Sequence, residues 1–252
     1  MNTPTFSIDP TEFSGKRVFV TGGTKGAGEA MIRRFAAGGA RVATTARTAP
    51  KDSDLPGVFV AADLSTAAGA AKAAQAVIEA LGTPDIVVHN LGGSKTPAGG
   101  FAGLSDELWM DELNLNLLGA VRLDRTFVPA MVQRGNGIVI HVSSIQRLLP
   151  LHETTTAYAA AKAALTTYSK ALSKETSPRG VRVVRVSPGW VETQAAMALL
   201  SVMGCDMIQG FLISRPIALD ALIRFMDADG HLATSATMRA PFDRLATVWK
   251  RA

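Results

Sequence analysis

Short apolar, β-favouring runs alternate with helical patterns along most of this chain, and this alternation limits the possible fold more than any other feature. The runs that read as strands are 17–20, 41–45, 58–61, 85–89, 137–142 and 181–186. Helical patterns separate them, and the main ones are 29–37, 65–81, 105–131 and 155–174. Strands joined through helices are parallel, and helices cover both faces of such a sheet. The sequence predicts one doubly wound α/β domain over 15–252, with a polar tail at 1–14 and a divergent region at 194–252.

The composition places the chain among folded globular proteins. Of its 252 residues, 47% are apolar and 19% are charged, which suits a packed core. No apolar run approaches the length of about 18 residues that a membrane span needs, and the first residues lack a signal-peptide pattern. The single cysteine, Cys205, suits a reducing compartment. We therefore expect a cytoplasmic protein.

The basic net charge does not indicate a nucleic-acid-binding protein. The formal charge is +5, but the basic residues are scattered and aromatic residues make up only 6%. Proteins that read nucleic acids usually gather positive charge on one helix or stripe. The excess charge fits a solvated surface, with local attraction for a small anionic ligand.

Polar and glycine-rich motifs follow five of the predicted strands. In doubly wound sheets, ligands bind outside the carboxyl ends of the strands. The motifs found at those ends are the turn 22–28, Asp63, the segment 90–93, Ser144 and the pair 188–189. Such clustering at one edge predicts a ligand site there.

The first strand leads into a glycine-rich turn suited to a dinucleotide. Gly22, Gly26 and Gly28 are spaced G-x-x-x-G-x-G. Small residues let the backbone approach a pyrophosphate, and the N-terminus of the following helix offers amides and partial positive charge. The alternative is a tight strand-to-helix turn without a ligand.

The end of the second strand favours NADP(H) over NAD(H). An NAD-preferring site usually carries an acidic residue there to hold the ribose hydroxyls. Here the sequence reads Thr44-Thr45-Ala46-Arg47. Arg47, together with Lys25, would instead meet a 2′-phosphate, for which arginine is well suited.

Tyr158 and Lys162 form a candidate proton-transfer pair. They lie four residues apart in a helical segment, so both side chains project from one face. A free phenol titrates near about 10, and a neighbouring ammonium favours its ionised form. Tyr158 could then pass a proton to or from a substrate oxygen. The alternative is a lysine whose stem simply packs along the helix.

Three further strand-end residues have two interpretations each. Asp63 could accept a hydrogen bond from an adenine amino group, or it could cap the helix that starts near Ser65. Asn90 could line a cofactor ribose or belong to a structural turn. Ser144 could hold a substrate oxygen or serve as an ordinary turn element.

Taken in order, these motifs resemble those of the short-chain dehydrogenase/reductase family, in particular its bacterial 3-oxoacyl-reductase-like members. The resemblance covers about residues 14–195 and implies a Rossmann-like fold. It implies that Tyr158 is the general acid or base, that Lys162 lowers its pKa and binds the nicotinamide ribose, and that Ser144 orients the substrate carbonyl. Asn116 matches the helix asparagine that holds a relay water, with Asn114 as a fallback.

The resemblance also implies a cofactor-binding set and an assembly. The expected cofactor-binding residues are Gly22, Thr24, Lys25, Gly26, Ala27, Gly28, Arg47, Asp63, Leu64, Asn90, Gly92, Tyr158, Lys162, Pro188, Gly189, Val191 and Thr193. A homodimer or homotetramer would form through the long helices near 106–125 and 158–174. The segment after Gly230 lacks the strand with which members of the family usually close.

The sequence therefore predicts an NADP(H)-dependent oxidoreductase that acts on a carbonyl or secondary alcohol. The alternative is a non-catalytic NADP(H)-binding sensor with the same fold. No His, Cys and carboxylate spacing predicts a metal site, and His141 and His152 are interpreted as structural. Leu148, Leu149, Leu151, Trp190, Met197 and Leu199 could border a hydrophobic pocket, although such residues are more often local core.

Overall fold

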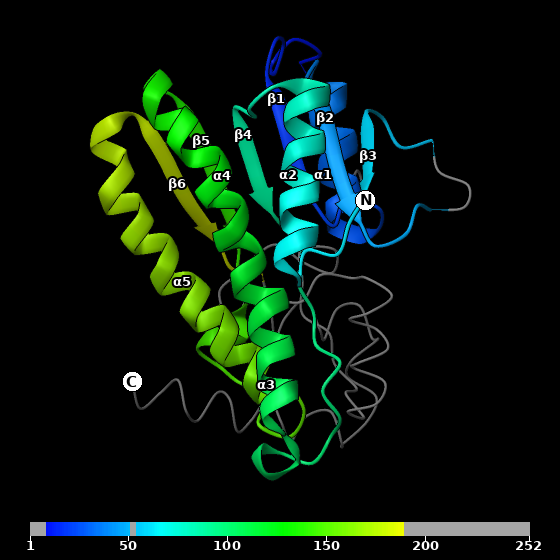
Figure 1. The fold of residues 1–252 in the computed structure, drawn as a ribbon, viewed down its shortest axis with the longest axis vertical. Coiled ribbons are helices and arrows are strands. Elements are labelled where there is room, and N and C mark those ends of the chain that lie inside the picture. The colour runs from blue at the N-terminus through cyan, green and yellow to red at the C-terminus, as the bar shows by residue number, and fades with distance from the viewer. Residues whose placement is uncertain (1–8, 51–53, 189–252) are drawn as a thin grey trace, which may run out of the picture. The chain divides into compact units, whose positions relative to one another are not determined.

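The computed structural model describes residues 9–50 and 54–188, and the fold below is that of these residues. The chain divides into two units, Met1–Gly189 and Trp190–Ala252. The described part contains one six-stranded sheet in the order β3-β2-β1-β4-β5-β6, with every neighbouring pair parallel (Figure 1). The strands are β1 Arg17–Thr21, β2 Arg41–Ala46, β3 Val58–Ala61, β4 Ile86–His89, β5 Gly137–Val142 and β6 Val181–Val186. The predicted doubly wound parallel sheet is confirmed.

Helices connect the strands, with one irregular turn in the longest connection. The α-helices are α1 Gly26–Ala37, α2 Ala67–Leu81, α3 Asp106–Leu113, α4 Gly119–Arg134 and α5 Thr156–Thr176. A π-helical turn, η2 Asn114–Leu118, joins α3 to α4. Short 3-10 turns lie at η1 Phe101–Gly103, η3 Ile145–Arg147 and η4 Ser177–Arg179. None of the helices in the described ranges is long and apolar enough to cross a membrane.

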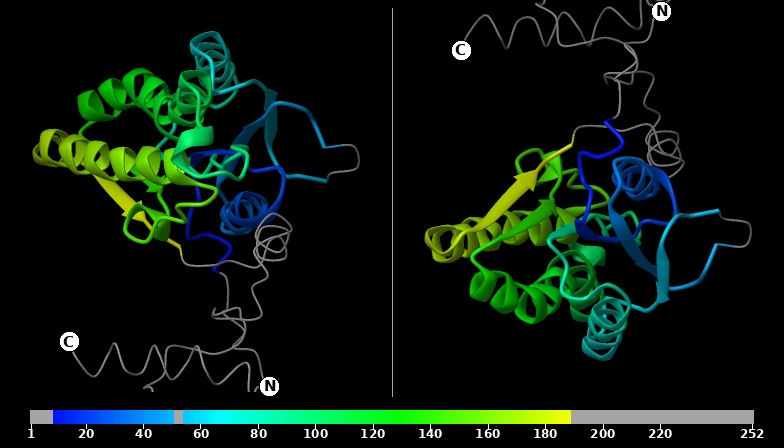
Figure 2. Two further views of the ribbon diagram at one scale, coloured as in Figure 1. Left: turned by 90° about the horizontal axis from the view of Figure 1, so that it is seen from below. Right: turned by 90° about the horizontal axis from the view of Figure 1, so that it is seen from above.

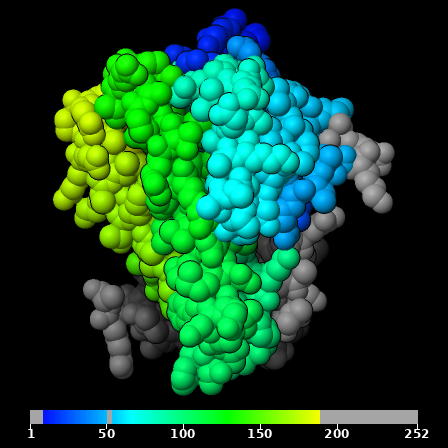
Figure 3. Space-filling view, viewed as in Figure 1, coloured from blue at the N-terminus to red at the C-terminus, as the bar shows by residue number. Residues whose placement is uncertain are grey.

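Two apolar layers sandwich the sheet. Among the described helices, α2, α4 and α5 cover one face and α1 covers the other (Figure 2). In the space-filling view, the cyan, green and yellow-green atoms of the chain that include α2, α4 and α5 form much of the visible surface (Figure 3). Successive side chains of a strand point to opposite faces: Phe19 packs with α2 and α4, whereas Val18 and Val20 pack with Ile32 of α1. The near-continuous apolar character of β1 follows from this burial on both sides.

The strand order creates a switch point between β1 and β4. From β1 the chain first builds outward through β2 to β3, and then returns to β4 on the other side of β1. Val20 is consequently paired with Thr44 of β2 and with Val88 of β4. Loops that leave β1 and β4 diverge at this point, and open α/β sheets bind ligands in the crevice between such loops.

At the amino edge of the sheet, a bidentate ion pair ties β1 to the start of β4. The Arg17 guanidinium donates to both oxygens of Asp85, at 2.9 and 2.7 Å. Nearby, Phe13 packs edge-to-face on Phe35 of α1, with 4.9 Å between ring centroids. The described end of the predicted polar tail is therefore docked against α1.

Candidate active site

Several glycine positions in the turn after β1 have no room for a side chain. Gly22 has a φ of +69° and Gly26 a φ of +55°, backbone conformations that favour glycine. A Cβ on Gly28 would lie 2.2 Å from the carbonyl oxygen of Gly22, and one on Gly23 would lie 2.3 Å from Thr44 Oγ1. The backbone at the start of α1 is therefore packed closely onto the turn. Lys25, the N-cap of α1, makes no side-chain capping hydrogen bond, which leaves the first amides of the helix available to an anion.

The loop after β4 is bonded to the same turn. Asn90 Nδ2 donates to the carbonyl oxygens of Thr21 and Gly22, at 3.3 and 3.4 Å. The Leu91 amide donates to Thr21 Oγ1 at 2.9 Å. These bonds favour the structural interpretation of Asn90: its amide holds the two diverging loops at a fixed separation.

The end of β2 carries Arg47, one of the two residues that the sequence predicts at a 2′-phosphate. Thr44 and Thr45 are buried, and each hydroxyl donates to a backbone carbonyl of a neighbouring strand. Arg47 follows and is exposed, as is Lys25 across the turn. No carboxylate stands at this position. Two exposed cations thus follow the carboxyl ends of the neighbouring strands β1 and β2.

Asp63 makes a turn rather than the helix cap. Its Oδ1 accepts from the Ser65 amide at 3.0 Å and from the Ser65 hydroxyl at 2.8 Å. The N-cap of α2 is Thr66, whose hydroxyl accepts from the Gly69 amide. The bonds from Ser65, helped by the charges of Arg47 and Lys95, lower the pKa of Asp63. It therefore remains an acceptor at neutral pH. Leu64, next to it, is buried.

Tyr158 and Lys162 occupy one face of α5, as their spacing predicts. Lys162 is buried, its Nζ donates to the Val142 carbonyl at 2.9 Å, and it lies 5.8 Å from the centroid of the Tyr158 ring. Burial lowers the pKa of Lys162 to about 8, although the charge of Glu112 acts in the opposite sense. At neutral pH the amine is therefore mostly charged.

The environment of Tyr158 differs from the expected one. Burial raises the pKa of Tyr158, the Ser144 hydroxyl counteracts this, and the charge of Glu112 raises it further. The lowering that we expected from Lys162 is not seen in the protein alone: burial dominates the pKa of Tyr158, and Lys162 Nζ donates to Val142 at the end of β5. Tyr158 is consequently held in its protonated form.

Ser144 is held at the end of β5 beside this pair. It is 9% exposed and serves as the N-cap of η3, where its Oγ accepts from the Gln146 amide at 3.2 Å. The Gln146 side chain in turn accepts a bond from the Thr155 hydroxyl. Gln146 and Thr155, which the sequence did not single out, thereby join η3 to the start of α5.

Asn116, rather than Asn114, faces the active site. It lies in the π-helical turn, is 2% exposed, and its Oδ1 accepts from the Gly93 amide at 3.0 Å. A Cβ on Gly92 would lie 2.9 Å from Asn116 Oδ1 and 2.7 Å from Lys162 Nζ. Asn114 instead accepts from Arg122 at 2.7 Å. π-Helical turns are frequent at functional sites. Here the turn places the Asn116 side chain beside Gly92, close to Lys162.

Glu112 is a site residue that sequence reasoning missed. It is 4% exposed, and its carboxylate accepts from Asn116 Nδ2 at 2.8 Å and from the Lys95 amide at 3.2 Å. The sequence contained a signal for Glu112, because it lies four residues before Asn116 and residues four apart on a helix meet on one face. A buried carboxylate next to a candidate tyrosine–lysine pair is the feature that a search by known motifs overlooks.

A second buried polar cluster lies behind the site. His89 Nε2 and His141 Nε2 bond to opposite oxygens of Asp124, at 2.7 and 3.0 Å, and the Tyr168 hydroxyl donates to Asp124 at 3.0 Å. The two imidazoles are stacked, 5.0 Å apart and 11° from parallel. A metal ion would have to lie in the plane of both rings, whereas parallel rings aim at separate points. The cluster is therefore arranged as a hydrogen-bonded network, consistent with the structural interpretation of His141.

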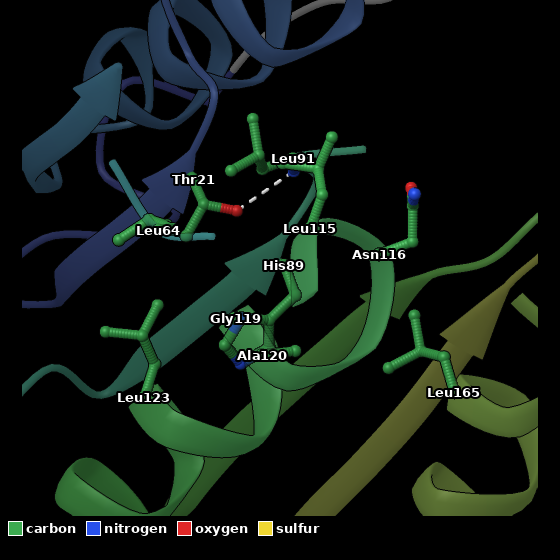
Figure 4. A pocket seen from close by; sticks show the side chains of 10 residues that line it. All are labelled: Thr21, Leu64, His89, Leu91, Leu115, Asn116, Gly119, Ala120, Leu123 and Leu165. Carbon is green, nitrogen blue, oxygen red and sulfur yellow. Dashed lines mark hydrogen bonds between the residues drawn. The ribbon is translucent and has the colours of Figure 1, made fainter. Parts of the chain in front are cut away.

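Two hollows among the described residues are not lined by Ser144, Tyr158 or Lys162. A cavity of about 10 Å³ lies between β4 and the π-helical turn, room for one water at most. Figure 4 shows its wall, including Asn116, His89 and the bond from the Leu91 amide to Thr21. A larger hollow of about 280 Å³ is lined by residues at the amino ends of β2 and β3. The candidate residues Ser144 and Lys162 lie instead at the carboxyl end of β5.

Several predicted residues fall outside the described part of the chain. Pro188 is placed just after β6, but Gly189, Val191 and Thr193 lie beyond it. So do Trp190, Met197 and Leu199 and the whole divergent region. Of the proposed pocket residues, Leu148 and Leu149 are each 67% exposed.

Comparison with known proteins identifies one family that this chain resembles over most of its length. Residues 16–202 match the family model described as short chain dehydrogenase. The 3-oxoacyl-[acyl-carrier-protein] reductase FabG of Escherichia coli is 32% identical over 193 residues, which cover 74% of this chain and 78% of that protein. A short chain dehydrogenase of Pseudocercospora fijiensis is also 32% identical, over 73% of this chain and 62% of its own length.

Solved structures give the same result. The L-sorbose reductase of Gluconobacter frateurii, complexed with NADPH and L-sorbose, has a TM-score of 0.69 at 30% identity and covers 78% of each chain. The 3-ketoacyl-(acyl-carrier-protein) reductase of Brucella melitensis, complexed with NADH, has a TM-score of 0.66 at 28% identity, over 73% of this chain and 80% of that one. With its parallel sheet, glycine turn and Ser144–Tyr158–Lys162 group, the chain belongs to the short-chain dehydrogenase family.

Proposed function

We propose that this protein is an NADP(H)-dependent oxidoreductase that interconverts a carbonyl and a secondary alcohol, with Tyr158 as the general acid or base. The observation that carries the proposal is the meeting of Lys162 and Asn116 at Gly92, after β4, with Tyr158 beside the same lysine. An oxidoreductase of this kind needs a cofactor crevice and a proton donor at the same edge, and the diverging loops after β1 and β4, with Tyr158 near them, support both roles.

The residues present fit a nicotinamide dinucleotide. The uncapped start of α1 and the glycine-rich turn at 22–28 suit a pyrophosphate. Lys162 donates to one carbonyl, and an ammonium has three donors, which leaves capacity for ribose hydroxyls. When bound, the nicotinamide supplies or accepts a hydride at the substrate carbon.

Side chains of the protein would donate the proton and replace it. Because burial raises the pKa of Tyr158, the phenol is protonated at neutral pH and suited to protonate a carbonyl oxygen during reduction. Ser144 would donate a hydrogen bond to the same oxygen and so favour developing negative charge. The charged Lys162 would stabilise the tyrosinate that remains. Asn116 would hold the water through which the proton is replaced.

The preference for NADP(H) rests on Arg47 and Lys25. Both are exposed cations beside the glycine turn, where an acidic residue would suit NAD(H). The relatives do not decide this point, since the L-sorbose reductase was solved with NADPH and the Brucella reductase with NADH. We further propose a cytoplasmic homodimer or homotetramer that assembles through α3–α4 and α5.

The test is a parallel fluorescence titration with NADPH and NADH, followed by turnover of a broad carbonyl panel. We expect tighter binding of NADPH, and turnover that disappears in Tyr158→Phe while NADPH still binds. The matched control is Tyr168→Phe, because the chain has two tyrosines and Tyr168 bonds to Asp124 instead. Binding of NADPH without turnover of any carbonyl would favour a sensor, and binding of neither cofactor would refute the proposal.

A further inference from the structure

Glu112 is a buried carboxylate directly behind the proposed catalytic group. It is 4% exposed, on the last turn of α3, one helical turn before Asn116. Oε2 accepts from Asn116 Nδ2 at 2.8 Å, and Oε1 accepts from the Lys95 amide at 3.2 Å. One carboxylate thus bonds both to the helix asparagine and to the backbone of the loop that follows β4.

These bonds determine which way the Asn116 amide points. Its Nδ2 faces three acceptors, namely Glu112 Oε2, the Glu112 carbonyl and the Gly93 carbonyl. Its Oδ1 faces a donor, the Gly93 amide. Turning the amide over would set Nδ2 against that donor and Oδ1 against the three acceptors. The carbonyl oxygen is therefore held toward Gly92 and the Lys162 amine.

The charge of Glu112 also acts on α5. The ionisable groups that face it are Tyr158 and Lys162 on α5 and Asp111 on its own helix. Burial raises the pKa of Glu112, and the hydrogen bonds from Ser94, Lys95 and Asn116 oppose that rise. As a carboxylate, Glu112 raises the pKa of both Tyr158 and Lys162.

We propose that Glu112 is a positioning residue of this active site, whose carboxylate orients the Asn116 carbonyl oxygen toward Lys162 and ties the 93–95 segment to α3. Its role in turnover rests on the proposed function, whereas its action on the asparagine and the tyrosine does not. A glutamine would fill the same volume, but its single carbonyl oxygen could accept only on one side. Its NH₂ group would then face the Asn116 or the Lys95 donor, and the Asn116 amide would lose its unique orientation.

Three variants of the full-length protein separate charge from shape. Glu112→Gln removes the charge at constant size, and Glu112→Asp keeps the charge on a shorter side chain. Glu107→Gln is the matched control, because it removes the same charge from an exposed position on α3. Thermal unfolding of each variant checks that the fold is retained.

The first readout does not depend on turnover. The ultraviolet absorbance of tyrosinate is titrated with pH, and the same titration of Tyr158→Phe is subtracted; only Tyr158 and Tyr168 contribute. Glu112→Gln should move the titration of Tyr158 to lower pH, because a negative charge beside the phenol is lost. Glu112→Asp and Glu107→Gln should leave it close to that of the wild type. An unchanged titration in a folded Glu112→Gln protein would overturn the proposal.

The second readout is the pH profile of carbonyl reduction. For Glu112→Gln we expect kcat to fall about tenfold, which corresponds to one misoriented buried hydrogen bond, with little change in the KM for NADPH. The alkaline limb of the profile should move to lower pH, and Glu112→Asp should restore its position. A kcat within twofold of the wild type with an unmoved limb would refute the positioning role. If the wild type itself turned over no carbonyl, the proposed function would fail, and the absorbance titration would still decide the role of Glu112.

Discussion

At the scale of single residues, the most demanding position of the site is Gly92. A methyl group there would lie 2.7 Å from Lys162 Nζ and 2.9 Å from Asn116 Oδ1, closer than such atoms can approach. The backbone of Gly92 does not have a positive φ, so alanine is compatible with its conformation. Gly92→Ala therefore tests the close approach of Gly92 to Lys162 and Asn116, and not the backbone conformation of the turn. We expect kcat to fall about 100-fold, since displacements of about 1 Å have effects of that size.

The control for this prediction is Gly103→Ala. Gly103 lies in η1, and no atom lies within 4 Å of the position its Cβ would take. That variant should keep full activity. Steady-state kinetics and thermal unfolding of both variants provide the measurement. Normal kcat in Gly92→Ala would mean that the active enzyme does not use the observed approach of Lys162 to Asn116.

Arg47 determines the cofactor preference if the proposed 2′-phosphate contact is made. Arg47→Asp replaces a phosphate-binding cation with a repelling carboxylate at the end of β2. We expect NADPH binding to weaken about 100-fold and NADH binding about threefold or less, because NADH lacks the phosphate. Fluorescence titrations with both cofactors measure the two changes.

Lys16→Asp makes the same charge change at the opposite edge of the sheet. Lys16 is exposed just before β1, far from the end at which β1 meets the glycine turn. It should weaken both cofactors slightly and equally. Equal weakening of NADPH and NADH in Arg47→Asp would refute the assignment of Arg47 to the phosphate.

At the scale of the elements, the helix boundaries were predictable where local signals mark them. The predicted helical pattern 105–131 begins at Ser105, a residue type that favours the N-cap, and its hydroxyl accepts from the Leu108 amide. The sequence also predicted one continuous helix from there to about 131. Instead a π-helical turn at Asn114–Leu118 separates α3 from α4. Asn116 in this turn bonds to Gly93, which lies 23 residues earlier, and local propensity carries no information about such a contact.

The ion pair between β1 and β4 gives an element-scale prediction about pH. The hydrogen bond from Arg17 lowers the pKa of Asp85, although partial burial opposes this. A carboxylate with a depressed pKa stabilises the fold above its unfolded pKa, and that contribution is lost as the pH falls through the folded value. Asp85→Asn should therefore cost about 1–2 kcal/mol at pH 7 and almost nothing near about pH 2. Urea unfolding at both pH values provides the measurement.

Asp54→Asn is the control for that prediction. Asp54 also pairs with an arginine, Arg33, at 2.7 Å, but its side chain is 87% exposed. Exposed pairs contribute about 0–1 kcal/mol, so this variant should stay close to the wild type at both pH values. If Asp85→Asn behaved in the same way, the bidentate pair would not stabilise the junction of β1 and β4.

At the scale of the whole molecule, the sheet and its switch point follow from the alternation of strands and helices, because right-handed crossovers leave few topologies. The sequence could also place the turn, Ser144, Tyr158 and Lys162 on one edge, since each follows a strand or shares a helix face. It could not predict the network around Asp124. His89, His141 and Tyr168 are separated from Asp124 by 35, 17 and 44 residues, and no periodic pattern relates them.

That network joins β4, β5, α4 and α5, so its loss should lower the stability of the whole fold. Burial opposes the charge of Asp124, but His89 and His141 outweigh it and lower the pKa of Asp124. Burial also lowers the pKa of His141. Asp124 stabilises the fold above its unfolded pKa and loses this effect as the pH falls through its folded pKa. His141 adds a destabilisation that begins once the pH falls below the unfolded histidine value of about 6.5.

Asp124→Asn should therefore destabilise the protein by about 3 kcal/mol at pH 7, because the amide oxygen can serve only one imidazole and leaves the other buried donor unpaired. Asp111→Asn, on the exposed face of α3, should have little effect. Asp124→Asn should also lose stability less steeply than the wild type as the pH falls below about 4, because the wild type must then protonate its buried carboxylate. Urea unfolding between pH 7 and pH 3 tests both statements. If the free energy of unfolding fell with pH equally steeply in Asp124→Asn and in the wild type, His89 and His141 would not be lowering the pKa of Asp124.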